Sequence, residues 1–423
     1  MLPGAPFLER TDGALRLDGL RLAELAAEYG TPLYVYSQRA MLDALASYER
    51  ALQGRDHLIC YAVKANANLA VLQTFARAGC GFDIVSGGEL ARVLACGARA
   101  DRVVFSGVGK TAAEMRQALL AGVRCFNVES LSELERLSAQ AVAVGREAPV
   151  SLRVNPDVDA GTHPYIATGL RDNKFGIAHE EALRAYRRAA ELPGLSVIGI
   201  DCHIGSQITQ IDPYLDALDR LLDLVEAVEA TGIALHHVDI GGGLGIRYAD
   251  ETPPRAEDLM AQVVARMDAR GHGARSLWLE PGRSLVGNAG VLVTEVLALK
   301  PSRQGKSFCI VDAAMNDLAR PALYQSWMAI EACQVRDDVA ASTWDVVGPV
   351  CESGDWLGRD RKLAVAEGDL LAVLSAGAYG MTMASNYNTR PRAAEVLIVD
   401  GHARLVRERE RVESLFALER LLP

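Results

Sequence analysis

The stretch Cys60-Tyr61-Ala62-Val63-Lys64-Ala65-Asn66-Ala67-Asn68 places a lysine at the end of an apolar run, directly before small polar residues. This arrangement is typical of a lysine presented at the mouth of a barrel. Partial desolvation there lowers the pKa of the amine and makes it a nucleophile for Schiff-base chemistry. A surface lysine that merely ends a strand is the alternative, so the rest of the chain must decide between the two.

Apolar β-type runs alternate with helical patterns after residue 57. Segments between the runs carry apolar residues at helical spacing, such as Leu69, Leu72 and Phe75. The eight runs are His57–Ala65, Gly81–Ser86, Val103–Gly107, Arg124–Ser130, Val150–Pro156, Leu195–Ser206, His236–Gly243 and Ser276–Arg283. Such alternation predicts an α/β fold with a parallel sheet, and eight units predict a (β/α)8 TIM-type barrel. A doubly wound open sheet is the alternative.

Polar residues crowd the ends of these runs, which favours the barrel over the open sheet. They are Lys64, Asp83, Ser106, Asn127, Arg153, His203, Gly241–Gly243 and Glu280–Arg283. Active sites of such barrels are built at the carboxyl ends of the strands, and phosphate sites often follow the seventh and eighth. We therefore expect these residues to share one site.

The sequence pattern changes after Leu285, where short β-type runs are separated by Gly, Asp and Arg turns. These runs are Gly290–Leu299, Phe308–Asp312, Asp345–Val350, Lys362–Glu367, Leu370–Ser375, Glu395–Asp400 and Ala403–Arg407. They predict a second, mainly antiparallel β domain. We expect the barrel to span residues 33–285 and the β domain to combine residues 1–32 with 286–423.

Composition excludes several classes of protein. The net charge of −10 argues against nucleic acid as a partner. No secretory signal is recognisable and no apolar stretch is long enough to span a bilayer, so no membrane partner is expected. The eight cysteines lie far apart without a Cys-x-x-Cys pair, so neither a metal site nor a disulfide framework is predicted. These features indicate a cytoplasmic enzyme with a small-molecule substrate.

Two glycine-rich segments resemble nucleotide-binding motifs but fail their requirements. Gly107-Val108-Gly109-Lys110-Thr111 would need a glycine at position 104, where Val104 stands. Gly241-Gly242-Gly243-Leu244-Gly245-Ile246 has Ile246 in place of the third glycine and does not follow a first strand. A nicotinamide oxidoreductase is therefore disfavoured, although the second segment can still hold a single phosphate.

A Schiff-base lysine, a phosphate cradle and a carboxylate for a ring nitrogen are together the requirements of pyridoxal 5′-phosphate. Lys64 supplies the amine, and Ser206 with the Gly241–Gly243 turn supplies phosphate donors. Glu280 is the candidate for the ring nitrogen, with an ion pair to Arg283 as its alternative role. His203 could stack on a flat cofactor, although a lone histidine is more often structural.

Several motifs resemble the pyridoxal-phosphate decarboxylases that have an alanine-racemase-like barrel. They are Tyr61–Asn66, His203–Gln207, Asp239–Gly243 and Glu280–Arg283. Later segments resemble the diaminopimelate decarboxylase family in particular, in matching order over nearly the whole chain. These are Arg320–Tyr324, Cys351–Asp355, Ala378–Met381 and the loop of residues 163–176.

The resemblance implies roles around the cofactor. Lys64 forms an aldimine with pyridoxal phosphate, His203 stacks on the ring, and Glu280 meets the pyridine nitrogen. The remaining cofactor-binding residues implied by the family are Asp83, Ser206, Gly242, Gly243, Gly282, Arg283 and Tyr379.

It also implies roles around the substrate. Arg283 and Arg320 grip the retained carboxylate, a task that suits a guanidinium. Tyr324 and Tyr379 line the same end. Glu352 takes the distal ammonium, and Cys351 supplies or relays the proton that replaces CO2. In the family these last two residues reach the site from the partner subunit, so a homodimer with shared active sites is implied.

The implied reaction is decarboxylation of meso-2,6-diaminopimelate to L-lysine and CO2, the last step of lysine biosynthesis. From the residues alone, a racemase or transaminase would begin from the same covalent state. A decarboxylase for ornithine or arginine and a non-catalytic pyridoxal-phosphate carrier are further alternatives. Arg283 with Arg320 favours a substrate with a second carboxylate, and Cys351 with Glu352 argues against a mere carrier.

Overall fold

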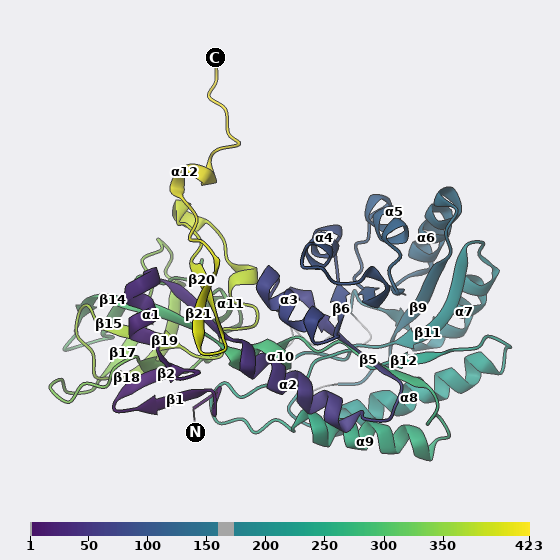
Figure 1. Ribbon diagram of the computed structural model, residues 1–423, viewed down its shortest axis with the longest axis horizontal. Coiled ribbons are helices and arrows are strands. Elements are labelled where there is room, and N and C mark those ends of the chain that lie inside the picture. Colours follow the sequence, from purple (N-terminus) through teal and green to yellow (C-terminus); the bar gives the residue numbers. More distant parts are fainter. Residues whose placement is uncertain (1, 160–172) are drawn as a thin grey trace. The chain divides into compact units, whose positions relative to one another are not determined.

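A computed structural model describes residues 2–159 and 173–423, and the chain forms two compact units. We call Ala44–Ile246 with Thr252–Ser284 the barrel unit. Met1–Asp43, Arg247–Glu251 and Leu285–Pro423 form the β unit. Figure 1 labels the elements of both units. The described part of the chain contains no helix that is both long and apolar enough to cross a membrane.

The barrel unit contains a closed barrel of eight parallel strands, which confirms the predicted (β/α)8 architecture. The strands are β5 (His57–Ala62), β6 (Gly81–Ile84), β7 (Val103–Phe105), β8 (Cys125–Val128), β9 (Ala148–Asn155), β11 (Leu195–Asp201), β12 (His237–Asp239) and β13 (Ser276–Leu279). Pairing of β13 with β5 and of β8 with β9 closes the ring. A two-residue strand, β10 (Ile177–Ala178), pairs in parallel with the last two residues of β9.

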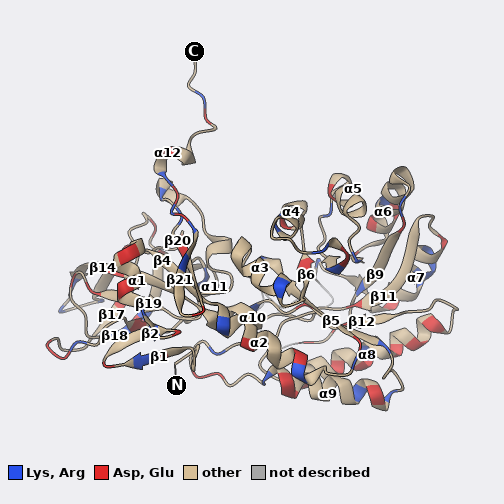
Figure 2. Ribbon diagram, in the orientation of Figure 1, with Lys and Arg blue, Asp and Glu red and all other residues tan. Residues whose placement is uncertain are grey.

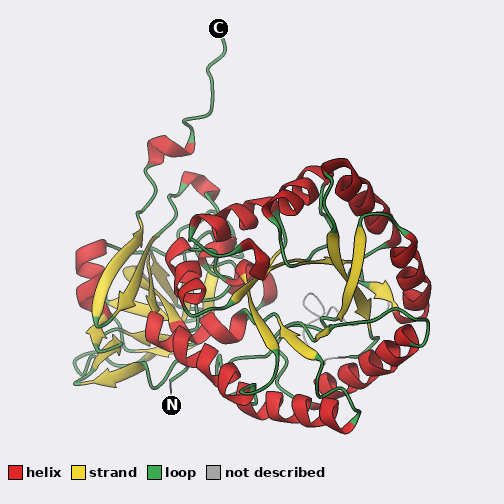
Figure 3. Ribbon diagram, turned by 45° about the vertical axis from the view of Figure 1, so that its right-hand side comes forward, coloured by secondary structure: helices red, strands yellow, loops and turns green. Residues whose placement is uncertain are grey.

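Helices surround these strands, as Figure 3 shows. They are α2 (Gln38–Ala51), which begins before the unit boundary, α3 (Leu69–Arg77), α4 (Gly87–Ala95), α5 (Ala112–Ala121), α6 (Leu131–Val144), α7 (Ala182–Glu191), α8 (Asp212–Glu229), α9 (Ala256–Ala269) and the short α10 (Arg283–Val286). Thr111 and Glu114 form a capping box at the start of α5. Gly122 and Gly145 end α5 and α6 in the left-handed conformation, which glycine adopts without steric cost. Acidic and basic side chains are interspersed along the helices (Figure 2).

The β unit is built on a mixed, mainly antiparallel sheet with the strand order β18-β17-β15-β14-β4-β20-β21. Its strands are β4 (Leu33–Ser37), β14 (Gly290–Lys300), β15 (Phe308–Val311), β16 (Ile330–Ala332), β17 (Ser342–Val347), β18 (Trp356–Leu363), β19 (Leu370–Val373), β20 (Ala394–Val399) and β21 (His402–Arg407). The pairs β4–β20 and β15–β17 are parallel. A small sheet of β1 (Leu8–Thr11), β2 (Ala14–Leu17) and β3 (Leu20–Arg21) accompanies the helices α1 (Leu22–Tyr29), α11 (Arg320–Tyr324) and α12 (Val412–Leu415).

The structure corrects two expected boundaries. Residues 33–37 were placed in the barrel, but β4 pairs with β14 and β20 in the β unit. Leu33 and Val35 are buried in the core of that unit, which explains why this strand lies at the centre of its sheet. The run expected at Lys362–Glu367 is instead β18, which begins at Trp356 and ends at Leu363.

Candidate active site

Lys64 lies on a single 3-10 turn (Val63–Ala65) directly after β5, rather than within the strand as its run suggested. Its Nζ is 2.7 Å from Oδ2 of Asp83, a residue of β6. The Lys64 side chain is 39% exposed, whereas that of Asp83 is fully buried. A buried carboxylate therefore holds a solvent-accessible amine at the carboxyl end of the first barrel strand.

Glu280 follows β13 and is held by two donors from the far side of the barrel, at the ends of β7 and β8. Its Oε1 accepts hydrogen bonds from Nδ2 of Asn127 at 2.9 Å and from Oγ of Ser106 at 3.3 Å. Burial raises the pKa of the Glu280 carboxyl, and Asp83 and other nearby acids raise it further. A cationic partner, such as a protonated ring nitrogen, would offset this cost.

His203 follows β11 and is oriented by the glycine turn after β12. The backbone N–H of Gly242 donates to Nδ1 of His203 at 3.1 Å, so the ring proton of the neutral imidazole lies on Nε2. Burial and the nearby cations Arg153 and Lys64 hold the pKa of His203 well below its usual value. The N–H of Gly242, expected at a phosphate, thus serves the imidazole instead.

The glycines that follow the seventh and eighth strands are sites of close backbone approach. A side chain at Gly243 would collide with the carbonyl oxygen of Gly205, and one at Gly282 would press on Ala65 at 3.0 Å. Beside this turn, Nη2 of the buried Arg283 donates to Oγ of Ser206 at 2.8 Å. Glycine is thus required at these positions because neighbouring segments of the barrel unit pack directly against them.

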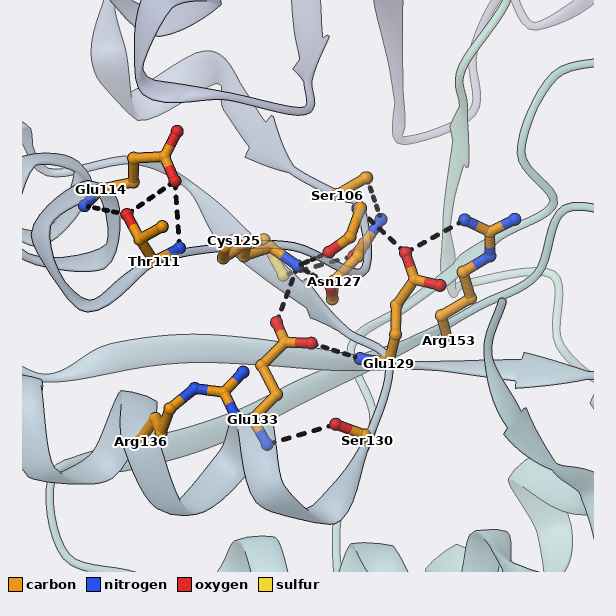
Figure 4. Close-up of polar contacts among 12 residues, drawn as sticks. Ser106, Thr111, Glu114, Cys125, Asn127, Glu129, Ser130, Glu133, Arg136 and Arg153 are labelled. Carbon is orange, nitrogen blue, oxygen red and sulfur yellow. Dashed lines mark hydrogen bonds and ion pairs between the residues drawn. The ribbon is translucent and has the colours of Figure 1, made fainter. Parts of the chain in front are cut away.

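A polar network that the sequence did not assign connects β7, β8 and β9 (Figure 4). Glu129 accepts hydrogen bonds from the N–H groups of Gly107 and Gly176 and pairs with Arg153 at 3.2 Å. Glu133 accepts from the N–H of Glu129. Ser106, Asn127 and Arg153 were recognised as polar strand ends, but their partners are distant in sequence.

Lys110, the lysine of the failed nucleotide-binding motif, belongs to this network. Its fully buried Nζ donates to the carbonyl oxygens of Gly107 and Asn127 and to Oε1 of Glu133. All three acceptors lie at 2.7–2.8 Å. The ammonium therefore ties strand ends together, and no phosphate-binding role remains for it.

In the β unit, Arg320 begins α11 and is 6% exposed. Its guanidinium carbon lies 5.3, 5.6 and 6.0 Å from the ring centres of Tyr248, Tyr324 and Tyr379. Nη2 also donates to Oγ of Ser326 at 3.3 Å. The structure thus brings three of the predicted substrate-binding residues together as an arginine surrounded by tyrosines.

Cys351 and Glu352 lie on an exposed loop of the same unit. Asp355 fixes this loop by accepting the N–H groups of Met315 and Val350 at 2.7 and 2.8 Å. Glu352 accepts a hydrogen bond from the hydroxyl of Tyr387 at 2.6 Å. A thiol and a carboxylate are therefore presented to the outside of the unit.

The predicted loop of residues 163–176 lies mostly outside the described residues, which resume at Asn173. Of its motif residues, Phe175 is described, and the guanidinium carbon of Arg153 lies 4.9 Å from its ring centre. This contact fixes the end of the loop beside the Glu129 network.

Comparison with known proteins agrees with this geometry. The family described as "Pyridoxal-dependent decarboxylase, pyridoxal binding domain" matches residues 39–287. The chain therefore belongs to the pyridoxal-dependent decarboxylases.

Within that class, the chain is similar to diaminopimelate decarboxylases over its full length. The protein of that name from Pseudomonas aeruginosa is 58% identical over 412 residues, covering 97% of this chain and 98% of that protein. The crystal structure of diaminopimelate decarboxylase from M. jannaschii has a TM-score of 0.95 at 39% identity, covering 100% and 99% of the two chains. The Helicobacter pylori enzyme, crystallised with L-lysine, has a TM-score of 0.89 at 41% identity, covering 94% and 98%.

The cofactor of this family is pyridoxal 5′-phosphate, and the barrel unit fits it. The glycine turns follow the seventh and eighth barrel strands, where such barrels often bind phosphate, and the neutral imidazole of His203 can face a ring. Glu280 is a buried carboxylate that lacks a cation among its described hydrogen-bond partners. Lys64 completes the set with an accessible amine.

Proposed function

We propose that this chain converts meso-2,6-diaminopimelate to L-lysine and CO2, the last step of lysine biosynthesis. The observation that carries the proposal is the grouping of Lys64, Asp83 and Glu280 at the carboxyl end of one barrel. The full-length similarity to diaminopimelate decarboxylases supports the choice of substrate. A racemase or transaminase would use the same cofactor but would not release CO2.

Pyridoxal 5′-phosphate, when bound, supplies an electron-withdrawing ring that accepts the electron pair left by departing CO2. Lys64 would hold the cofactor covalently through Nζ. Asp83 keeps that amine in place through its 2.7 Å contact. Glu280, fixed by Asn127, keeps the ring nitrogen protonated and so maintains the electron-withdrawing power of the ring.

The other barrel residues orient the cofactor. His203 presents a neutral ring face, held by the N–H of Gly242. Ser206, Gly243 and Gly282 hold the phosphate, and Arg283 supports this end through Ser206. We also propose that the hydroxyl of Tyr379, a residue of the β unit, contributes to phosphate binding.

The β unit recognises the substrate. Arg320, with Tyr324 and Tyr379 beside it, binds the carboxylate that is retained, together with Arg283. A desolvated guanidinium forms strong, bidentate bonds with a carboxylate, which favours diaminopimelate over substrates that lack one. Glu352 binds the distal ammonium, and Cys351 delivers the proton to the carbon that has lost CO2.

We include a homodimer with shared sites in the proposal. The exposed positions of Cys351 and Glu352 support it, because a proton donor to a buried reaction must be covered when it acts. We also propose that the protein is cytoplasmic. This location is supported by the eight cysteines, all of which are free thiols.

A substrate panel tests the proposal. Purified protein supplied with pyridoxal phosphate is assayed for CO2 and amine products from meso-diaminopimelate, lysine, ornithine and arginine. We expect CO2 and L-lysine from diaminopimelate and little turnover of the others. Preferential release of CO2 from ornithine or arginine would assign the chain to a basic-amino-acid decarboxylase instead. Inversion or transamination without CO2 would exclude both.

A further inference from the structure

Three buried carboxylates lie together at the carboxyl ends of adjacent barrel strands. Asp201 ends β11, Asp239 ends β12, and Glu280 follows β13. An oxygen of each lies within 4.8 Å of an oxygen of the other two. The residues are only 1%, 0% and 6% exposed. Water cannot screen their mutual repulsion, so three full negative charges at this point would be strongly unfavourable.

Hydrogen-bond donors are distributed unevenly over this cluster. Oε1 of Glu280 accepts from Asn127 and Ser106, and Oδ1 of Asp239 accepts from the N–H of Gly241 at 2.8 Å. By contrast, Oδ1 of Asp201 and Oδ2 of Asp239 are buried without a hydrogen-bond partner in the described part of the chain. Buried polar atoms are rarely left unsatisfied, and one proton between these two carboxyl groups would satisfy both.

The surrounding charges do not neutralise the cluster. Lys64 pairs with Asp83 at 2.7 Å, and Arg153 pairs with Glu129 at 3.2 Å. Each cation thus already faces another acid. The titratable groups that surround the cluster are Lys64, Asp83, Glu129, Arg153, the thiols of Cys60, Cys125 and Cys202, and the neutral His203. A bound proton is the simplest remaining way to reduce the charge.

We propose that Asp201 and Asp239 share one proton and thereby leave Glu280 as the carboxylate that carries its full charge. The two aspartates are positioning residues, since they act on the cofactor through Glu280. The donors Asn127 and Ser106 favour this distribution because they stabilise an ionised Glu280. The effect of an ionised Glu280 on the cofactor rests on the proposed function, whereas the shared proton itself does not.

The electrostatics of the two aspartates agree with a bound proton on this pair. Burial raises the pKa of Asp201 to about 7, and the positive charge of Arg153 is the largest influence that lowers it. Burial also raises the pKa of Asp239 well above its usual value, and the charge of Asp201 is the next cause. The charge of Asp201 therefore makes ionisation of Asp239 harder, as between the members of other carboxyl pairs that share one proton.

Infrared difference spectroscopy on the full-length protein loaded with pyridoxal phosphate tests the shared proton. Titration through neutral pH should show a protonated-carboxyl stretch in the wild type. Asp201→Asn and Asp239→Asn should each remove it completely, because both residues hold the same proton. The matched control is Asp317→Asn, a buried acid of the β unit, which should leave this band in place. The absence of the band, or its survival in either aspartate variant, would overturn the proposal.

A charge count provides the second readout. Asp201→Asn leaves the same net charge as a singly protonated pair, so the acid-side transition in the visible absorbance of the cofactor should keep its midpoint. The double variant Asp201→Asn with Asp239→Asn removes one more negative charge near Glu280. Its midpoint should move to lower pH by about one unit or more. A shift already present in Asp201→Asn would mean that the wild-type pair is doubly ionised.

A divalent cation is the competing occupant of these oxygens. Elemental analysis of the purified protein, before and after a chelator, is the corresponding measurement. The protein could instead contain a stoichiometric metal ion that the chelator removes together with the spectral effects of the aspartate substitutions. That result would show that the carboxylates bind a metal ion and do not share a proton. Failure of the proposed function gives a different result, namely no CO2 from the wild type, whatever the infrared spectra show.

Discussion

The barrel unit and the β unit present their polar residues in opposite ways. In the barrel unit the important groups are already bonded to one another, as in the Lys64–Asp83 and Asn127–Glu280 contacts. In the β unit, Cys351 and Glu352 are exposed on a loop. The difference indicates that the barrel carries a preorganised cofactor site, whereas the loop leaves its thiol and carboxylate open to solvent.

The largest effect should follow from loss of the cofactor anchor. Lys64→Ala should remove the visible absorbance of the lysine-bound cofactor and lower kcat by about three orders of magnitude or more, because no other described amine is presented at this site. Absorbance spectra and CO2 release measure both effects. Lys300→Ala, at an exposed lysine of the β unit, is the control and should behave as the wild type.

The next effect concerns Glu280. In Glu280→Gln the side chain keeps its size and loses its charge, so kcat should fall by about 10²-fold or more while the covalent link to Lys64 persists. Asn127→Ala removes one donor to Glu280 and the Asn127 hydrogen bond to Ser106 but keeps the Glu280 charge, so its effect should be smaller, about tenfold. Steady-state kinetics with absorbance spectra separate the two. Equal kcat values for Glu280→Gln and the wild type would remove Glu280 from the mechanism.

A change in the β unit should alter substrate binding and spare the cofactor. Arg320→Met should raise KM for diaminopimelate by about 10- to 100-fold, the cost of losing a charged hydrogen-bond donor, without changing the absorbance spectrum. Arg359→Met, at an exposed arginine stacked on Trp356, is the control. If Arg320→Met bleached the cofactor instead, the division between the two units would be wrong.

The last effect is a pH dependence of stability, which leaves the reaction itself untouched. Burial raises the pKa of Asp201 from 3.8 to about 7 in the folded state, so folding takes up a proton in that range. The resulting stability is complete below pH 3.8 and is lost as the pH rises to about 7, at up to about 1.4 kcal/mol per pH unit. Denaturation of Asp201→Asn should lack this loss, so its stability relative to the wild type should rise between the two pH values. A constant difference would contradict the raised pKa.

The sequence was sufficient to predict the barrel. Apolar residues predominate in the barrel strands, and Lys64 and Glu280 stand at the ends of two of the predicted runs. The sequence was not sufficient to predict the contacts that orient these residues. The Asn127–Glu280 hydrogen bond joins positions 153 residues apart, and only closure of the barrel brings them together. The unit to which β4 belongs was missed for the same reason, because its β-type run fits either sheet and its partners lie far along the chain.

The comparison between the two units is tested most directly by mixing subunits. Lys64→Ala and Cys351→Ala are each expected to be inactive alone. If Cys351 serves the barrel of a partner, a mixed dimer combines one intact barrel with one intact loop. Random exchange should then restore about a quarter of wild-type activity, because half the dimers are mixed and each has one working site. No recovery after demonstrated exchange would show that each chain builds its site alone.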